Sequence, residues 1–231
     1  MVEQIAAELK RNLLRFNIIG TTDEDDLIGS FRLINGNTVW QHGGAVQAML
    51  DGSILLLDEM DLGNERLLCL QSILEGKGVY VKKQNLWVTA NAGFSIIATG
   101  NTKGRGSEDG KFIGTNILNE AFLDRFDFTF VQEYPDQNIE FDILKNRFPN
   151  VSSDFVMNLV QWAKLIRNTY DEGAISEVIS PRRLFSILKA YSTFNDKEKA
   201  INICLSRFDE NIKTALFSLY TKIDSMEVNR K

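Results

Sequence analysis

Two adjacent acids, Asp58 and Glu59, are the residues of this chain whose types and spacing most directly suit chemistry. They follow the apolar run Ile54-Leu55-Leu56-Leu57 without a gap. A short continuous apolar run is typical of a strand buried in a parallel sheet, and ligands of open α/β sheets bind at the carboxyl ends of such strands. There, one carboxylate can hold Mg²⁺ through its oxygens and the next can orient or deprotonate a water that attacks a phosphate. The segment alone is equally compatible with a buried strand that ends in a solvated acidic turn.

Three further polar residues follow the acid pair in chain order. Asn101 comes after a second apolar run, Arg125 follows a short helical pattern, and Arg182 comes directly after Ser180-Pro181. Each has an ordinary alternative when taken singly. Asn101 also suits a loop cap, Arg125 a surface ion pair with a neighbouring aspartate, and Arg182 a solvated position on a helix that Ser180 caps.

The elements that must position these residues divide into an α/β part and a helical part. Strand signals and short helices alternate up to Pro135, and only amphipathic helical patterns follow. We therefore expect one domain over residues 1–135 and a second over 136–231. The expected strands cover 15–19, 54–57, 94–99 and 128–131. The expected hairpins cover 31–40 and 78–88. The expected helices cover 1–15, 43–50, 67–74, 116–123, 137–148, 152–170, 181–194 and 197–224.

Composition narrows the class of protein. The chain has 231 residues, of which 44% are hydrophobic and 25% are charged, as is usual for a soluble globular protein. Its net charge of -5 argues against nonspecific binding of duplex DNA. No apolar run is long enough to span a membrane, and Cys69 and Cys204 are expected to be buried thiols of a reducing compartment. These features predict a cytoplasmic protein.

In their order and spacing, these signals resemble the AAA+ ATPases of the MoxR and dynein-related branch, most closely the ATPase subunit of cobaltochelatase. The resemblance covers essentially the whole chain. It is most specific in Asp26-Leu27-Ile28-Gly29, Leu57-Asp58-Glu59, Ala98-Thr99-Gly100-Asn101-Thr102 and the stretch from Gly114-Thr115 through Leu123-Asp124-Arg125-Phe126. It implies a parallel-sheet P-loop NTPase core followed by a small all-helical lid domain.

The resemblance also implies a role for each candidate residue. Asp58 and Glu59 look like a Walker B motif, in which Asp58 helps hold Mg²⁺ beside ATP and Glu59 activates the attacking water. Asn101 looks like sensor 1, and Arg125 looks like an arginine finger that acts in the site of a neighbouring subunit. Arg182 looks like sensor 2 on the lid, with Arg183 as a weaker candidate. The hairpins would match segments that point toward the pore of a hexameric ring in this branch.

One part of the family pattern is missing. The phosphate-binding loop G-x-x-x-x-G-K-[ST] occurs nowhere in the sequence, and the first helical pattern has no capping residue before it. We therefore expect that the sequence starts just after the loop, and that the first core strand and the loop are absent. Without the loop's bonds to phosphate, the 231 residues are expected to hydrolyse ATP poorly or not at all.

The leading functional expectation is an ATPase module that forms a homo-oligomeric ring and remodels or activates a protein partner, including metal-chelatase-type activation. Two alternatives stay open. One is a catalytically silent AAA+-like assembly subunit, which the missing loop favours. The other is a DNA-remodelling AAA+ protein, although the acidic net charge makes a nucleic-acid partner a poorer match. We expect no association with a membrane, and no site in this chain for a macrocycle or for the metal inserted into it.

Overall fold

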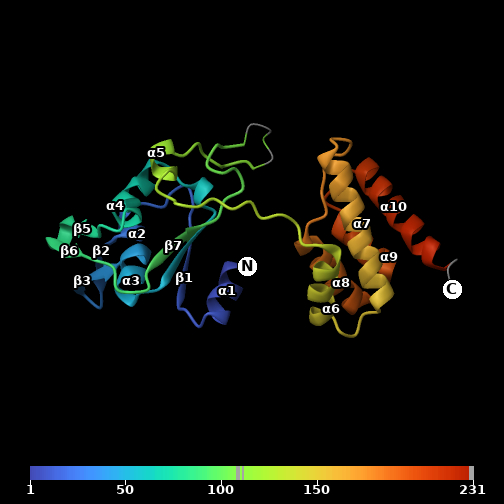
Figure 1. The fold of residues 1–231 in the computed structure, drawn as a ribbon, viewed down its shortest axis with the longest axis horizontal. Coiled ribbons are helices and arrows are strands. Elements are labelled where there is room, and N and C mark those ends of the chain that lie inside the picture. The colour runs from blue at the N-terminus through green and yellow to red at the C-terminus, as the bar shows by residue number, and fades with distance from the viewer. Residues whose placement is uncertain (108–109, 111, 229–231) are drawn as a thin grey trace. The chain divides into compact units, whose positions relative to one another are not determined.

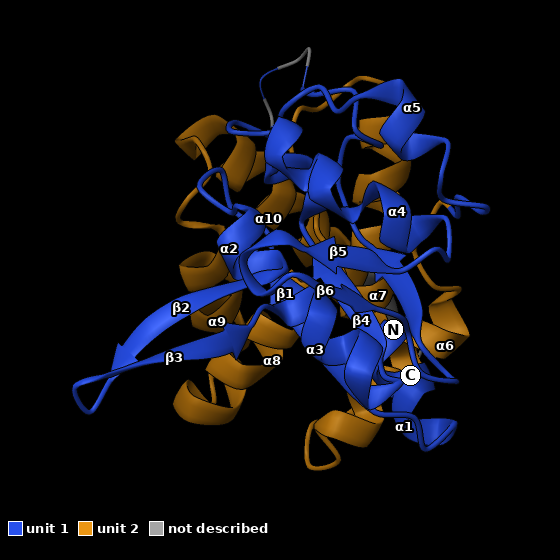
Figure 2. Ribbon diagram, turned by 90° about the vertical axis from the view of Figure 1, so that its left-hand side faces the viewer, with its two compact units in different colours: residues 1–130 blue, residues 131–231 orange. Residues whose placement is uncertain are grey.

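The computed structural model describes residues 1–107, 110 and 112–228. The chain forms two compact units, unit 1 over Met1–Phe130 and unit 2 over Val131–Lys231 (Figure 2). Unit 1 mixes short helices with strands, and unit 2 is helical in its described part. No helix in the described ranges combines the length and the apolar character that a membrane crossing requires.

A three-stranded parallel sheet forms the centre of unit 1, in the order β1 (Leu13–Asn17), β4 (Ile54–Asp58), β7 (Ser95–Ala98). Residues of β4 are buried up to Leu57 because the strand has a neighbour on each side. The helix α3 (Gly44–Asp51) packs on β1 and β4 through its apolar residues (Figure 1). The predicted α/β class with a parallel sheet is thereby confirmed.

Two antiparallel hairpins lie outside this sheet. The first joins β2 (Gly29–Ile34) to β3 (Asn37–His42) and projects from the rest of unit 1 (Figure 2). Its turn residues Asn35 and Gly36 both have positive φ, as the predicted two-residue turn requires. The second joins β5 (Val79–Val81) to β6 (Leu86–Val88) through the 3₁₀ turn η3 (Lys82–Gln84). Both hairpins were predicted from the sequence.

The remaining elements of unit 1 are short. The helix α2 (Glu24–Leu27) has a capping box, in which Asp23 and Asp26 each accept a bond from the other's backbone N–H. The segment after β4 contains the 3₁₀ helices η1 (Met60–Leu62) and η2 (Glu65–Leu70), and η2 leads into α4 (Gln71–Leu74). The helix predicted over 67–74 is therefore partly 3₁₀.

The first predicted helix is too long. The helix α1 covers only Val2–Glu8, and Lys10 takes a left-handed conformation with φ of 52°. Residues 13–17 form β1 instead, because they pair with all five residues of β4. Strand pairing in the sheet thus outweighs the helical spacing of Leu9 and Leu13.

Two predictions near the end of unit 1 also need correction. Only α5 (Glu120–Leu123) is helical within the predicted helix 116–123, since Asn119 is its N-cap and accepts from Phe122 N at 3.2 Å. The predicted strand 128–131 is not a strand. Its Phe128 and Phe130 are 78% and 85% exposed, and in the described ranges β7 pairs with β4 alone. Without a strand beside it, an alternating apolar segment cannot form a ladder.

Unit 2 packs its helices around α7 (Ser153–Asp171), most of whose apolar residues are fully buried. The others are α6 (Gln137–Arg147), α8 (Pro181–Phe194), α9 (Lys197–Leu205) and α10 (Glu210–Val228). The predicted helix 197–224 is two helices, because Phe208 is buried in the connection between them. Trp162 anchors α7 to α10 by donating to Leu216 O at 2.9 Å.

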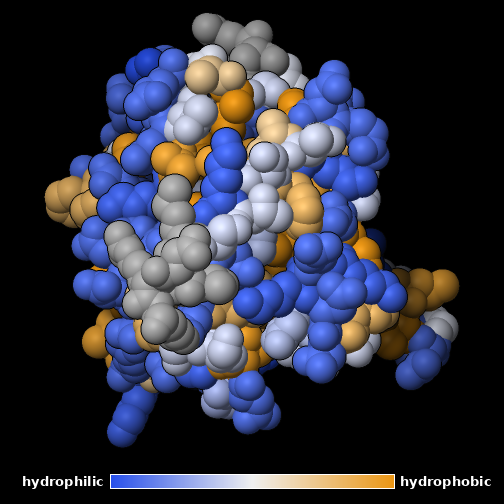
Figure 3. Space-filling model, turned by 90° about the vertical axis from the view of Figure 1, so that its right-hand side faces the viewer, coloured by the Kyte–Doolittle hydropathy of each residue, from blue (hydrophilic) through white to orange (hydrophobic). Residues whose placement is uncertain are grey.

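The surface of unit 2 agrees with this packing. The face that lies on the right-hand side of Figure 1 presents mainly hydrophilic residues, and its apolar residues form separate small patches (Figure 3). The buried apolar side chains of these helices form one core, while others such as Ile139 and Phe194 stay exposed. Unit 2 is therefore stabilised chiefly by its own interior.

Candidate functional site

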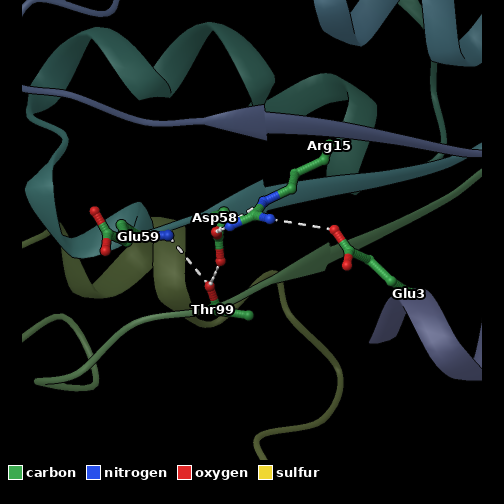
Figure 4. Close-up of polar contacts among 5 residues, drawn as sticks. All are labelled: Glu3, Arg15, Asp58, Glu59 and Thr99. Atoms are coloured by element: carbon green, nitrogen blue, oxygen red, sulfur yellow. Dashed lines mark hydrogen bonds and ion pairs between the residues drawn. The ribbon is translucent and has the colours of Figure 1, made fainter. Parts of the chain in front are cut away.

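Asp58 is the last residue of β4, and its side chain is held by polar contacts from both neighbouring strands (Figure 4). The Thr99 hydroxyl, just after β7, donates to Asp58 Oδ1 at 2.5 Å. Arg15 of β1 donates to Asp58 Oδ2 through both Nε, at 3.0 Å, and Nη2. The carboxylate is thus oriented at the carboxyl end of the sheet, where it was predicted to lie.

Glu59 leaves the strand with a sharp change of backbone direction. Its φ of 58° is in the left-handed region, which is costly for a residue with a side chain and is often found at functional sites. Its backbone N–H donates to Thr99 Oγ1 at 3.1 Å. The side chain is exposed, and its carboxylate points away from the Asp58–Arg15 pair (Figure 4). That carboxylate makes no hydrogen bond or ion pair with another described residue, so it can accept a bond from water.

Arg15 is a member of the site that the sequence reasoning missed. Its guanidinium also lies 3.2 Å from Glu3 Oε1 of α1, so it joins α1 to the end of β4. The hydrogen bond and the charge of Asp58 raise the pKa of Arg15. The signal available in the sequence was one basic residue between the apolar residues Leu14 and Phe16 of the strand pattern.

Asn101 lies two residues beyond Thr99, so β7 brings it to the same edge of the sheet as the acid pair. Its backbone N–H donates to Asp61 Oδ2 at 2.6 Å, whereas its side chain is exposed. Asp61, which is 1% exposed, is the second residue that the sequence reasoning missed. Its proximity in sequence to Asp58 and Glu59 was the available signal.

Arg125 lies elsewhere in unit 1, after α5. Its Nε is 2.7 Å from Glu75 Oε1, and its Nη1 donates to Ala121 O. Lys77 binds the other carboxylate oxygen of Glu75, also at 2.7 Å. These two cations lower the pKa of Glu75, Lys77 more than Arg125. The ion pair considered for Arg125 thus exists, but with Glu75 instead of a neighbouring aspartate.

Arg182 and Arg183 both belong to unit 2, at the start of α8. Ser180 caps this helix by accepting from Arg183 N at 3.3 Å, and Pro181 occupies its first turn. Arg182 is exposed. Arg183 is half-buried and donates to Cys204 O at 2.9 Å, and burial lowers its pKa. Arg182 is therefore the arginine of this pair that solvent or a ligand can reach.

The residues at the end of β4 fit a magnesium ion only in part. Each oxygen of Asp58 already accepts a hydrogen bond, from Thr99 or Arg15. Among the described residues, no group of three or more His, Cys, Asp or Glu side chains could hold a metal. The donor set therefore suits an ion whose other ligands are phosphate oxygens and waters, as is usual for Mg²⁺ bound with a nucleotide.

Comparisons with known proteins agree with this architecture. A model of the AAA domain of the dynein-related subfamily matches residues 1–126, a span that contains Asp58, Glu59, Asn101 and Arg125. Aerobic cobaltochelatase subunit CobS of Sinorhizobium sp. is 26% identical over 238 residues, which cover 98% of this chain and 72% of that protein. Midasin of Giardia intestinalis is 27% identical over 174 residues, which cover 74% of this chain but 4% of midasin.

A solved structure shows the same fold at lower sequence identity. It is that of a candidate ATPase from Cytophaga hutchinsonii, with a TM-score of 0.50 and 18% identity, and the match covers 88% of this chain and 71% of that one. The family model covers more than half of the chain. The chain therefore belongs to the AAA domain family, in its dynein-related subfamily.

Proposed function

We propose that this chain is the ATPase module of a ring-forming AAA+ assembly, which couples ATP binding and hydrolysis to the remodelling or activation of a protein partner. The observation that carries the proposal is the Thr99 hydroxyl, which links the ends of β4 and β7 by contacting both Asp58 Oδ1 and Glu59 N. It holds two acids in fixed relation at the edge of the sheet where α/β proteins bind ligands.

In this proposal each residue has a separate task. Glu59, exposed and without a recorded protein partner among the described residues, accepts a proton from the water that attacks the γ-phosphate. Asn101 orients that water or the phosphate with its exposed amide. Asp58 would help hold Mg²⁺, directly or through a water, and the ion would offset the charge of the phosphate oxygens.

Two arginines extend the proposed site beyond the acid pair. Arg125 reaches the nucleotide of a neighbouring copy, which requires a homo-oligomer, and there it neutralises charge on the transferred phosphoryl group. Arg182 contacts nucleotide from unit 2, which acts as a lid. Its exposure supports this role, whereas Arg183 is occupied by Cys204 O.

The similarity to CobS favours a chelatase-associated partner over other partners. In that case the metal ion and the macrocycle would be bound by the partner; the described part of this chain holds no group of three or more His, Cys, Asp or Glu side chains that could bind a metal. The phosphate-binding loop is not within the 231 residues, so these residues alone should turn over ATP slowly or not at all. A catalytically silent assembly subunit is the second candidate function, and the missing loop favours it.

A fusion separates the two candidates. A strand and a G-x-x-x-x-G-K-[ST] loop from an active AAA+ ATPase are joined ahead of residue 1, and phosphate release is measured for the fusion and for the 231-residue chain. We expect turnover by the fusion only, and we expect Glu59→Gln to lower its kcat by about 10²–10⁴-fold, which is the range for loss of a general base. ATP binding, followed by the shift in melting temperature, should survive this substitution.

Glu65→Gln is the matched control, since Glu65 is also an exposed acid of unit 1 and lies in η2, outside the contacts that join Asp58, Glu59 and Thr99. It should leave kcat unchanged. A fusion that binds ATP but shows no Glu59-dependent turnover would establish the silent subunit instead. A fusion that folds and does not bind ATP would contradict the ATPase module.

A further inference from the structure

Asp61 is a buried acid with no part in the function proposed so far. It lies in η1, three residues after Asp58, and is 1% exposed. Its Oδ1 is buried and has no hydrogen-bond partner within the described residues. Burying a carboxylate is unfavourable unless its bonds compensate, so its position calls for an explanation.

The other carboxylate oxygen of Asp61 accepts three hydrogen bonds from the turn that follows β7. Asp61 Oδ2 accepts from Asn101 N at 2.6 Å, from Thr102 N at 2.9 Å and from Thr102 Oγ1 at 3.1 Å. Bonds from N–H groups to a charged oxygen are stronger than bonds between neutral groups. Asp61 thereby fixes the backbone of Asn101 directly.

Gly100 makes this arrangement possible. A Cβ atom at Gly100 would lie 3.1 Å from Asp61 Cγ and 3.3 Å from each carboxylate oxygen. The carboxylate therefore lies against the backbone of the turn, in space that a side chain would occupy. A larger residue at this position would displace the carboxylate or the turn by a few tenths of an ångström.

The backbone of Asp61 holds a second segment. Asp61 O accepts from Asn116 N at 2.7 Å, and the Asn116 side-chain amide donates to Gly63 O at 2.9 Å. The residues before Asp61 are also joined to the end of β7, since Met60 N donates to Thr99 O at 2.8 Å. Glu59 and Asn101 are therefore connected through consecutive hydrogen bonds between residues 59–61 and 99–102.

We propose that Asp61 is a positioning residue, which sets the location of Asn101 relative to Glu59. The inference rests on the proposed function, in which Asn101 and Glu59 act on the same water. An alternative is a purely structural anchor, whose loss would lower stability without a specific effect on the chemical step. The two roles therefore differ in whether loss of Asp61 lowers kcat in a protein that is still folded.

The first test follows backbone amides in the 231-residue chain by NMR hydrogen exchange. Asp61→Val removes the acceptor, so exchange at Asn101 and Thr102 should become about tenfold faster or more. Asp61→Asn keeps one acceptor oxygen of the same shape, so these rates should stay within about threefold of wild type. The amide of Thr99, which donates to Leu57 O, is the internal reference. Unchanged exchange at both amides in Asp61→Val would overturn the proposal.

A second variant keeps the test valid if Asp61→Val does not fold. Gly100→Ala places a methyl group against the carboxylate and should speed exchange at the same two amides. Gly20→Ala is its matched control, because its Cβ would meet only Leu62 O, at 3.9 Å. Equal exchange in the two glycine variants would count against the proposal.

The second test uses turnover by the loop-bearing fusion. Asp61→Val should lower kcat about tenfold to hundredfold and leave KM for ATP within about twofold, because a small displacement of a catalytic group affects the chemical step. Asp61→Asn should restore kcat to within about threefold of wild type. Unchanged kcat in Asp61→Val, or a loss that Asp61→Asn does not restore, would overturn positioning. A wild-type fusion that binds ATP without turnover would instead refute the proposed function. Hydrogen exchange alone would then test whether Asp61 holds the backbone of Asn101 in place.

Discussion

An arginine–carboxylate pair in unit 1, Arg15–Asp58, and one in unit 2, Arg167–Glu140, differ in how much solvent reaches them. In unit 1, the side chains of Arg15 and Asp58 are 49% and 19% exposed. In unit 2, those of Arg167 and Glu140 are 7% and 3% exposed. Arg167 donates to both oxygens of Glu140, at 2.8 and 2.9 Å, and to Ile179 O at 2.8 Å.

The difference shows how the same chemistry can serve two purposes. Arg167 joins α6, α7 and the segment before α8, and its guanidinium also lies 4.1 Å from the ring centre of Tyr134. Such a buried pair cannot lose a member without leaving an uncompensated charge. The pair of Arg15 and Asp58 lies closer to solvent, chiefly on the side of Arg15, so solvent screens its charges more strongly. Unit 2 thus uses its pair to join helices, whereas in unit 1 the pair orients Asp58 at the end of β4.

Removing Arg167 should have the largest effect. Arg167→Leu leaves Glu140 buried and charged, so the free energy of unfolding should fall by about 3–5 kcal/mol. Urea denaturation followed by circular dichroism measures this loss. Arg207→Leu is the control, since Arg207 is exposed, and it should change stability by less than about 1 kcal/mol.

The double variant Glu140→Leu/Arg167→Met sharpens this result. It replaces the pair with apolar side chains and should recover most of the stability that Arg167→Leu loses. A single variant within about 1 kcal/mol of wild type would contradict the assignment of the pair as a structural centre of unit 2.

The exposed pair should show a much smaller coupling. A double-mutant cycle of Arg15→Gln and Asp58→Asn, measured by the same denaturation, should give an interaction energy below about 1 kcal/mol. The reason is that solvent screens the charges and the side chain of Arg15 is about half exposed. A coupling as large as that of the buried pair would show that Asp58 is not readily available to a ligand.

The smallest expected effect is a pH dependence at Glu75. Lys77 and Arg125 lower its pKa below the ordinary value of 4.5, so its contribution to stability is present above that pH and is lost as the pH falls through the lowered value. The difference in urea midpoint between wild type and Glu75→Gln should therefore be present at about pH 6 and shrink at about pH 3. A difference that is equal at both values would mean that the pair is not formed in solution.

The fold was predictable where local signals and tertiary contacts agree. The run before Asp58 is apolar because both faces of β4 are covered, and Asn35-Gly36 permits the positive φ values of a tight turn. Prediction failed where a partner strand decides the conformation. Leu13 has helical spacing with Leu9 yet pairs with β4, and Phe128 has strand spacing without a pairing partner in the described ranges.

The candidate site was predictable for the same reason, and only in part. Asp58, Glu59 and Asn101 follow apolar runs whose strands end at one edge, so their proximity follows from the parallel sheet. Arg15 and Asp61 could not be assigned, because their importance arises from contacts with Asp58 and Asn101 across 43 and 40 positions of sequence. The catalytic roles of these residues remain predictions for the experiments above.

The hydroxyl of Thr99 links the two acids through a single atom. It has one hydrogen, which it gives to Asp58 Oδ1, and the same oxygen receives the backbone N–H of Glu59. Any ligand that draws Asp58 away from Thr99 releases that hydrogen and lets the hydroxyl rotate. The rotation turns the oxygen lone pair that accepts from Glu59 N. The side chain of Asp58 and the backbone of Glu59 are therefore coupled through this hydroxyl.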